Sequence, residues 1–340
     1  MGKENDLMLD YLRDNRRFAD LFNGSLFAGR QVVRANDLEE AGEVYTEYSD
    51  KAVEKSNRKK TKMTTRMRDI KKRLKTGEGL RILAVEDQSL VNYTMPWRCM
   101  NYDCLEYGRQ IKQIQENNQE KQEYADEGER TSRFTRSDAL IPVYTVCLYH
   151  GTERWDGPRR LNEMMQFGND EESMSWRPYF NDYGMNLICV NELDNLSVFK
   201  SGLRELFGIM AYRKDKQGMN QFLREHDEYR RLDEDTAVVI SGLMGVRKFM
   251  SDKERYKEGS GYNMCQAIRE MLEDSVNEGI SQGISQGISQ GIDLGKTQGV
   301  TLSAAVFRAI RSGVSDTREI AVSCDCTEED VLSVRKAFEI

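Results

Sequence analysis

The segment between residues 63 and 88 constrains the fold more than any other part of the chain. β-Branched and charged residues alternate before a Thr-Gly-Glu-Gly turn sequence at 76–79, and an apolar run of strand length follows at 80–85. Two strand-like segments around a glycine-containing turn predict a β-hairpin. Centring the hairpin on this turn gives a register in which paired residue numbers sum to about 155. We therefore expect Asp69 and Glu86 to lie almost opposite each other.

Helical and strand-like segments surround this hairpin. Apolar residues at helical spacing predict helices at 5–34, from Met95 onward, and over most of 197–275. The acidic segment 37–55 is expected to form helix and loop, and the polar segment 112–135 a helix end with an exposed insertion. Apolar runs predict strands at 141–149 and 185–193. Strands mixed with helices in this way predict an α/β fold.

Residues 278–299 contain an internal repeat, in which Gly-Ile-Ser-Gln occurs three times and glycine recurs every four residues. Each glycine inside a helix costs about 1 kcal/mol relative to alanine, so one interpretation is a linker. The other interpretation is a helix that packs against a partner helix, possible because glycine lets two backbones approach closely. This second interpretation predicts a homo-oligomer formed through the Gly-Ile repeat.

Beyond the repeat, three short helices are expected at 302–311, 316–322 and 327–338. Asp316 and Thr327 each stand three residues before an acidic residue, which is the spacing of a helix N-terminal capping box. The outline resembles a helix-turn-helix. Its last helix begins with Glu328, Glu329 and Asp330, which DNA phosphates would repel, so a packing or protein-binding module is favoured.

These features divide the chain into four regions. We expect an α/β domain at 1–195 and a helical extension at 196–277. The repeat, as helix or linker, occupies 278–300, and the small three-helix module occupies 301–340.

Composition excludes several classes of function. The chain has 340 residues, of which only two are histidines. This number argues against a histidine-based zinc site and against a Ser-His or Cys-His catalytic triad. We expect His150 and His226 to be surface or packing residues. Seven cysteines, an odd number, favour reduced thiols over a disulfide framework. Without a signal-peptide core or a long apolar run, the sequence predicts a cytoplasmic protein that contacts no membrane.

Charge is distributed unevenly along the chain. The net charge is −7, which by itself argues against a protein that coats nucleic acid. Residues 58–75, however, include ten Lys or Arg and one acid, Asp69, so this segment carries +9 and the remainder −16. The segment is either a solvated face or an arm that contacts phosphates.

Three residues of the hairpin could carry chemistry together. Side chains alternate along a strand, so Glu86 and Gln88 share one face and Asp87 points to the other. The register brings Asp69 beside Glu86. Two carboxylates with a neighbouring amide suit a hard divalent cation such as Mg²⁺, and the basic segment around Asp69 could bring a phosphate backbone to it. The alternative is that these acids are solvated residues at strand ends.

The order and spacing of several motifs resemble the PD-(D/E)XK nuclease superfamily, and within it the recombination-promoting nuclease (Rpn) and putative transposase family. The resemblance covers roughly residues 14–295. It rests on the following segments: Arg17 to Asn23, Arg66-x-Arg68-Asp69-Ile70, Glu86-Asp87-Gln88-Ser89, Tyr93-x-Met95-Pro96-x-Arg98 with Tyr102, Asp103 and Tyr107, Pro142-Val143, and Tyr149-x-Gly151 leading to Trp155-Asp156-Gly157.

This resemblance implies a restriction-endonuclease-like fold, with a central mixed β-sheet flanked by helices. It implies a metal-dependent DNA endonuclease linked to recombination or a mobile element, using Mg²⁺ or Mn²⁺. Asp69 and Glu86 match the metal ligands, and Gln88 stands where the superfamily more often has lysine.

DNA would be the partner of this nuclease. The residues expected to contact it are Arg66, Arg68, Lys71, Lys72 and Arg73. Gln88 is neutral and cannot act as a base, so a second hypothesis is a nuclease-derived DNA-binding or oligomeric interaction protein that no longer cuts.

Overall fold

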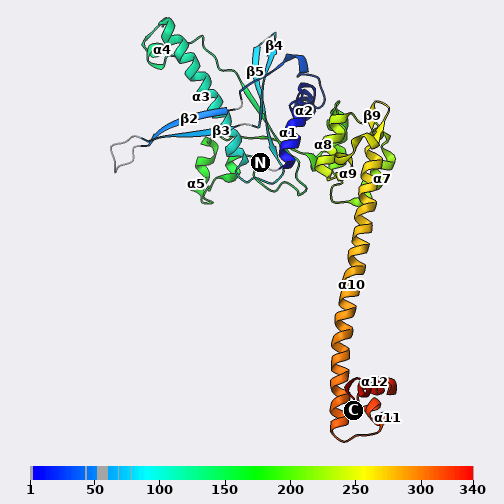
Figure 1. Cartoon of the computed structure of the whole chain (residues 1–340). Coiled ribbons are helices and arrows are strands. Elements are labelled where there is room, and N and C mark those ends of the chain that lie inside the picture. Colours follow the sequence, from blue (N-terminus) through cyan, green and yellow to red (C-terminus); the bar gives the residue numbers. More distant parts are fainter. Residues whose placement is uncertain (1–2, 43, 52–59, 68, 78, 340) are drawn as a thin grey trace. The chain divides into compact units, whose positions relative to one another are not determined.

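Figure 1 shows the computed structural model, which describes residues 3–42, 44–51, 60–67, 69–77 and 79–339. The chain divides into two compact units, Met1–Met271 and Leu272–Ile340. The first unit contains the main sheet, and the second contains the C-terminal helices. Within the described part of the chain, no helix combines the length and the apolar character needed to cross a membrane.

A five-stranded mixed sheet forms the centre of the first unit, in the order β1-β4-β5-β6-β7. The strands span Leu38–Glu40, Ile70–Thr76, Gly79–Gln88, Val143–Tyr149 and Asn186–Cys189. Strands β1, β4 and β5 are antiparallel neighbours, whereas β5, β6 and β7 are parallel. The sheet confirms the predicted α/β class and the predicted strands near 141–149 and 185–193.

The hairpin of β4 and β5 has the predicted register. Its pairs run from Ile70 opposite Val85 to Thr76 opposite Gly79, so all paired numbers sum to 155. The first arm is shorter than predicted, because the chain bends at Asp69 and the preceding strand β3, Lys60–Met67, belongs elsewhere. Strand β3 pairs with β2, Val44–Lys51, in a separate two-stranded sheet.

The prediction of helix and loop for 37–55 was wrong over 37–42 and 44–51, the part of this segment that the structure describes. A short 3-10 turn, Ala35–Asp37, leads into β1, and β2 follows from Val44. The acidic residues make the segment polar, but polarity alone does not distinguish a helix or loop from an exposed strand. The β-branched and aromatic residues of Val-Tyr-Thr-Glu-Tyr at 44–48 favour a strand, and pairing with β3 provides its hydrogen bonds.

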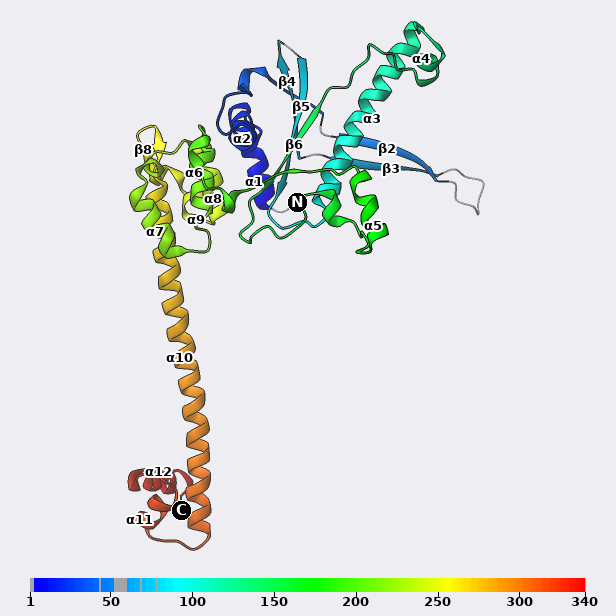
Figure 2. The same ribbon diagram turned by 180° about the vertical axis from the view of Figure 1, so that it is seen from behind.

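Helices cover both faces of the main sheet. Helices α1, Lys3–Leu12, and α2, Asn15–Phe27, lie on one side of β4 and β5, and α3, Met95–Lys121, lies on the other (Figures 1 and 2). Two short helices also follow in this unit, α4, Glu127–Ser132, and α5, Glu171–Trp176. The core beneath α3 contains Met95, Cys99, Cys147, Tyr149, Trp155 and Cys189. The polar segment 112–135 was predicted as a helix end with an exposed insertion. In the structure it continues α3 to Lys121, and α4 follows.

The predicted helical region after 197 is confirmed and belongs to the first unit as far as Met271. It comprises α6, Leu203–Met210, α7, Lys216–Glu225, α8, Glu234–Met244, α9, Arg247–Ser251, the start of α10 at Met264, and a small hairpin of β8, Lys257–Glu258, with β9, Gly261–Tyr262. Helix α8 packs against α1, where the Tyr11 hydroxyl lies 2.7 Å from the Thr236 hydroxyl. This contact is one reason that residues before and after 195 form one unit.

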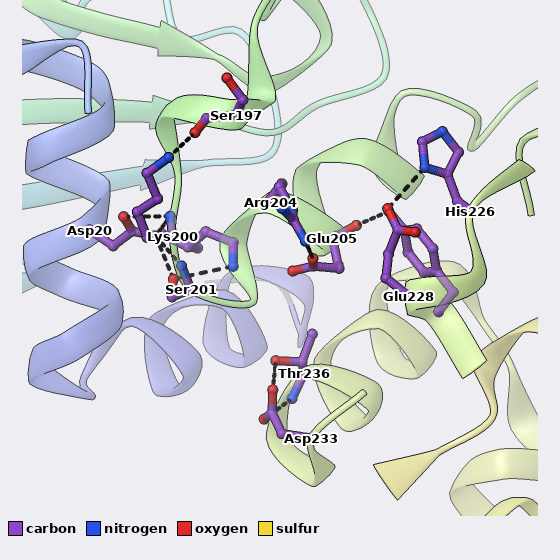
Figure 3. Close-up of polar contacts among 12 residues, drawn as sticks. Asp20, Ser197, Lys200, Ser201, Arg204, Glu205, His226, Glu228, Asp233 and Thr236 are labelled. Carbon is purple, nitrogen blue, oxygen red and sulfur yellow. Dashed lines mark hydrogen bonds and ion pairs between the residues drawn. The ribbon is translucent and has the colours of Figure 1, made fainter. Parts of the chain in front are cut away.

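Side chains of the N-terminal motif join α2 to the start of α6. Figure 3 shows Asp20 of α2 beside Lys200 and Ser201. Its carboxylate accepts hydrogen bonds from the backbone amides of both residues, at 2.8–2.9 Å, and from the Ser201 hydroxyl at 2.6 Å. Asn23 similarly binds the backbone of Val32 and Val33. These motif residues therefore organise the fold.

Replacing Asp20 with alanine is expected to lower the free energy of unfolding by roughly 2–4 kcal/mol. The change leaves two backbone amides, in partly buried positions, without their charged acceptor, and hydrogen bonds to charged groups are the stronger kind. Urea denaturation measures the effect. Asp10→Ala is the control, because that side chain is 81% exposed and its loss should change stability little. Equal stability of the two variants would contradict the assigned role of Asp20.

The second unit is built on the latter part of α10, Met264–Arg311, with α11, Thr317–Ser323, and α12, Glu328–Phe338. The Gly-Ile repeat lies within α10, so the helical interpretation of 278–299 is correct. Val306, Ile320, Ala321, Val331 and Val334 form the small core. Asp316 and Thr327 cap α11 and α12 as predicted, the latter in a reciprocal capping box with Asp330. Pairing of α10 with a second copy stays a prediction.

Candidate functional site

The candidate site lies where β4 begins and β5 ends. Asp69 occupies the bend immediately before β4, and Glu86, Asp87 and Gln88 are the last three residues of β5. Because Ile70 pairs with Val85, continuing the antiparallel register by one residue puts Asp69 opposite Glu86. After a short loop, Pro96 in the first turn of α3 starts the helix that brings Arg98 to the same place.

The carboxylates of Asp69 and Glu86 share one guanidinium nitrogen. The Nη2 atom of Arg98 lies 3.1 Å from Oε2 of Glu86 and 3.9 Å from Oδ1 of Asp69. The Glu86 side chain is fully buried and that of Asp69 is 3% exposed, whereas 26% of the Arg98 side chain is exposed. The predicted neighbours are therefore together, beside an arginine that reaches solvent.

A backbone hydrogen bond fixes the orientation of the Asp69 carboxylate. The Asp87 amide donates to Asp69 Oδ2 over 2.8 Å, which leaves Oδ1 as the oxygen nearer to Arg98. Gln88 lies two residues beyond Glu86 and donates its side-chain Nε2–H to the carbonyl oxygen of Asp87 over 2.6 Å. Gln88 is mostly buried.

Arg98 was part of a sequence motif but was given no role there. Burial alone would lower the pKa of Arg98, but Glu86 and Asp69 outweigh it and raise the pKa. The guanidinium therefore stays charged beside the two carboxylates. The one sequence signal for a role of Arg98 was its position in the first turn of the helix predicted after the hairpin. Only the fold shows that this turn faces Asp69 and Glu86.

Asp87 points away from Glu86, as strand alternation predicts, and meets His150. The His150 Nε2 atom lies 3.1 Å from Asp87 Oδ2, and both side chains are completely buried. Burial raises the pKa of Asp87, the contact with His150 opposes this, and the charge of Asp69 adds to the rise. His150 is thus an interior partner of the strand. His226 is 39% exposed and pairs with Glu228 (Figure 3), as expected of a surface histidine.

The predicted DNA contacts of Lys71 and Lys72 need correction. Lys71 is 4% exposed, and its Nζ donates to Glu106 of α3 over 2.8 Å. Lys72 is fully buried on the opposite face, where it donates to the Arg13 carbonyl oxygen and to Asn15 Oδ1, each over 2.7 Å, and to Glu40. Adjacent strand residues face opposite sides, so the fold turns both lysines inward against separate partners.

Of the other three predicted DNA-contacting residues, Arg66 and Arg73 lie on strands of two different sheets. Arg73 is partly exposed on β4, paired in register with Glu39 and Ile82. Arg66 lies on β3 of the two-stranded sheet, opposite Tyr45. Arg68 lies outside the described residues. Part of the +9 charge of the basic segment is therefore used inside the protein.

The donor set at the site suits a hard divalent cation in a limited way. Among the residues that the structure describes, no three or more His, Cys, Asp or Glu side chains gather as a metal-binding group. Asp69 and Glu86 together with the Arg98 guanidinium sum to a charge of −1. Mg²⁺ is commonly held by one or two carboxylates, with water and substrate phosphate completing its shell. The two carboxylates fit that pattern.

Comparisons with protein-family models, with curated proteins and with solved structures find no match to this chain. The resemblance to the Rpn nucleases stays a prediction based on the motifs. The feature of the site that bears most on function is the buried carboxylate pair at the end of β5.

Proposed function

We propose that the chain is a metal-dependent phosphodiesterase that cleaves DNA. The observation that supports this most is the pairing of Asp69 and Glu86, whose carboxylates lie within 3.9 and 3.1 Å of one guanidinium nitrogen. Burying two like charges together is unfavourable unless a cation compensates them. A divalent cation would supply the required charge.

The residues of the site have separate roles in this proposal. Asp69 and Glu86 would hold the cation, with Asp69 oriented by the Asp87 amide. When bound, the cation lowers the pKa of a coordinated water and stabilises charge on a phosphoryl oxygen. Gln88 would orient the attacking water or a phosphate oxygen through its amide. Hydrolysis forms one bond from the water oxygen to phosphorus and breaks the bond to an ester oxygen, which takes up a proton as it leaves.

The choice of DNA rests on charge in the sequence and on the motif resemblance. Lys60, Lys62 and Arg66 belong to β3, which leads directly into the bend at Asp69. Cations displace counterions from a phosphate backbone, so a basic segment next to the carboxylates favours a nucleic acid substrate over a small phosphate ester. The resemblance to recombination-promoting nucleases and transposases makes DNA the more specific choice.

One observation favours the alternative, a nuclease-derived DNA-binding or interaction protein that does not cut. The Arg98 guanidinium already compensates the carboxylate pair, as a buried ion pair does in a purely structural role. In that case the site would need no metal. The same test separates the two functions.

The test is nicking of supercoiled plasmid DNA with Mg²⁺, Mn²⁺, Ca²⁺ or EDTA. We expect nicking with Mg²⁺ or Mn²⁺, none with EDTA, and a loss of about 100-fold or more in Asp69→Asn, since metal-derived stabilisation is worth several kcal/mol. Asp10→Asn, an exposed carboxylate on α1, is the matched control. DNA binding without nicking would support the alternative, and nicking that survives Asp69→Asn would exclude this site.

A further inference from the structure

The positively charged guanidinium of Arg98 lies at the site where the proposed reaction would develop negative charge. A phosphodiester under attack spreads charge over its non-bridging oxygens, and fixed positive groups stabilise it. Gln88 is neutral, and Lys71 and Lys72 are engaged with Glu106 and Glu40. Arg98, in contrast, lies directly against the carboxylate pair.

The contact of Arg98 leaves part of its guanidinium available. The Nη2 atom of the guanidinium lies 3.1 Å from Glu86 and 3.9 Å from Asp69. Its Nε is buried and has no hydrogen-bond acceptor among the described residues. A quarter of the side chain is exposed, so a phosphate arriving from solvent can reach it. The planar fork of a guanidinium matches the geometry of phosphate oxygens.

The Arg98 guanidinium and a divalent cation would compete for the same carboxylate oxygens. Because the guanidinium lies 3.1 Å from Glu86, a cation bound to that carboxylate would be close to it. Two positive charges repel each other at such distances, so binding of one weakens the hold of the other. Arg98 has a long side chain on the first turn of α3, and a quarter of that side chain is exposed.

We propose that Arg98 holds the Asp69–Glu86 pair in the metal-free protein, and that it turns to contact the scissile phosphate once these carboxylates hold a divalent cation. The inference rests on the proposed function. Arg98 is then a catalytic residue with two states: a counter-ion that competes with the metal, and a clamp on the substrate. The tyrosine one turn along α3, Tyr102, lies beneath it with the guanidinium 5.7 Å from the ring centre and can support both positions.

Two measurements on Arg98→Gln test this. Isothermal titration calorimetry with Mn²⁺ and Ca²⁺, without DNA, should show affinity rising about 10-fold, because the competing charge is gone. Nicking at saturating metal should fall roughly 100-fold, because a charged donor to the phosphate is lost. Arg98→Lys should keep the metal affinity near that of the wild type and recover part of the nicking. Arg130→Gln, at an exposed arginine of α4, is the control.

The outcomes separate this inference from the proposed function. If the wild type binds metal and nicks DNA, but Arg98→Gln binds metal no more tightly or nicks normally, the inference is wrong and the proposed function stands. If the wild type neither binds metal nor nicks, both are wrong. Should Arg98→Gln fail to fold, as judged by circular dichroism, Arg98→Lys decides: reduced nicking with unchanged metal affinity supports the inference, and unchanged nicking overturns it.

Discussion

Replacing Glu86 with glutamine is expected to reduce metal-dependent DNA nicking at least about 100-fold, the equivalent of about 3 kcal/mol of lost transition-state stabilisation. The Glu86 side chain is fully buried between β5 and α3. Glutamine has nearly the same shape, so the change removes the charge with little effect on packing. A neutral amide is a much weaker ligand for a hard divalent cation than a carboxylate.

The effect should appear in metal binding as well as in catalysis. Titration of Glu86→Gln with Mn²⁺ should show weakened or absent binding, while circular dichroism shows a folded protein. Glu116→Gln is the matched control, because Glu116 belongs to α3 and its side chain is 62% exposed. A Glu86→Gln variant that nicks DNA as fast as Glu116→Gln would exclude Glu86 as a metal ligand.

Replacing Glu106 with glutamine is expected to lower the free energy of unfolding by roughly 3–5 kcal/mol, because it removes the countercharge of a buried lysine. Glu106 is fully buried on α3 and accepts from Lys71 at 2.8 Å and from Arg109 at 2.6 Å. The Lys71 side chain is 4% exposed, so water cannot replace the lost charge. Urea denaturation at pH 7 measures the loss, and a change within about 0.5 kcal/mol of Glu116→Gln would contradict it.

The stability conferred by Glu106 should also depend on pH. Burial alone would raise the pKa of Glu106, but hydrogen bonds from Arg109 and Lys71 outweigh burial and lower the pKa from 4.5 to about 2. A carboxyl whose pKa is lower in the folded state stabilises fully above its unfolded pKa and loses this contribution as pH falls through the folded value. The difference between wild type and Glu106→Gln should therefore shrink from about pH 4.5 to pH 2. An unchanged difference at pH 3 would contradict the paired state of Glu106.

Local sequence signals predicted the parts of the site that depend on neighbouring residues. The turn at 76–79 and the apolar run at 80–85 were enough to derive the register of β4 and β5, because a hairpin is determined by its turn. Strand alternation likewise separated Glu86 from Asp87. The caps at Asp316 and Thr327 followed the same logic, since a capping side chain binds backbone only a few residues away.

Residues distant in the chain could not be placed in this way. Lys71 and Lys72 look alike in a basic segment, yet one meets Glu106 on α3 and the other meets Asn15 on α2. His150 meets Asp87, from which it is separated by the whole of α3 and α4. Nothing in the local pattern specifies such partners, because they arise from which helix covers which face of the sheet.

The sequence by itself determined the hairpin, the alternation of its side chains and thus the neighbourhood of Asp69 and Glu86. These are short-range consequences of turn chemistry and strand geometry. Only the tertiary structure decided which cations reach that pair. Packing of α3 on the sheet brings Arg98 to the carboxylates and buries Lys71 against Glu106. The physical reason is that a buried charge is stable only where the fold supplies its counter-ion, and these counter-ions come from distant parts of the chain.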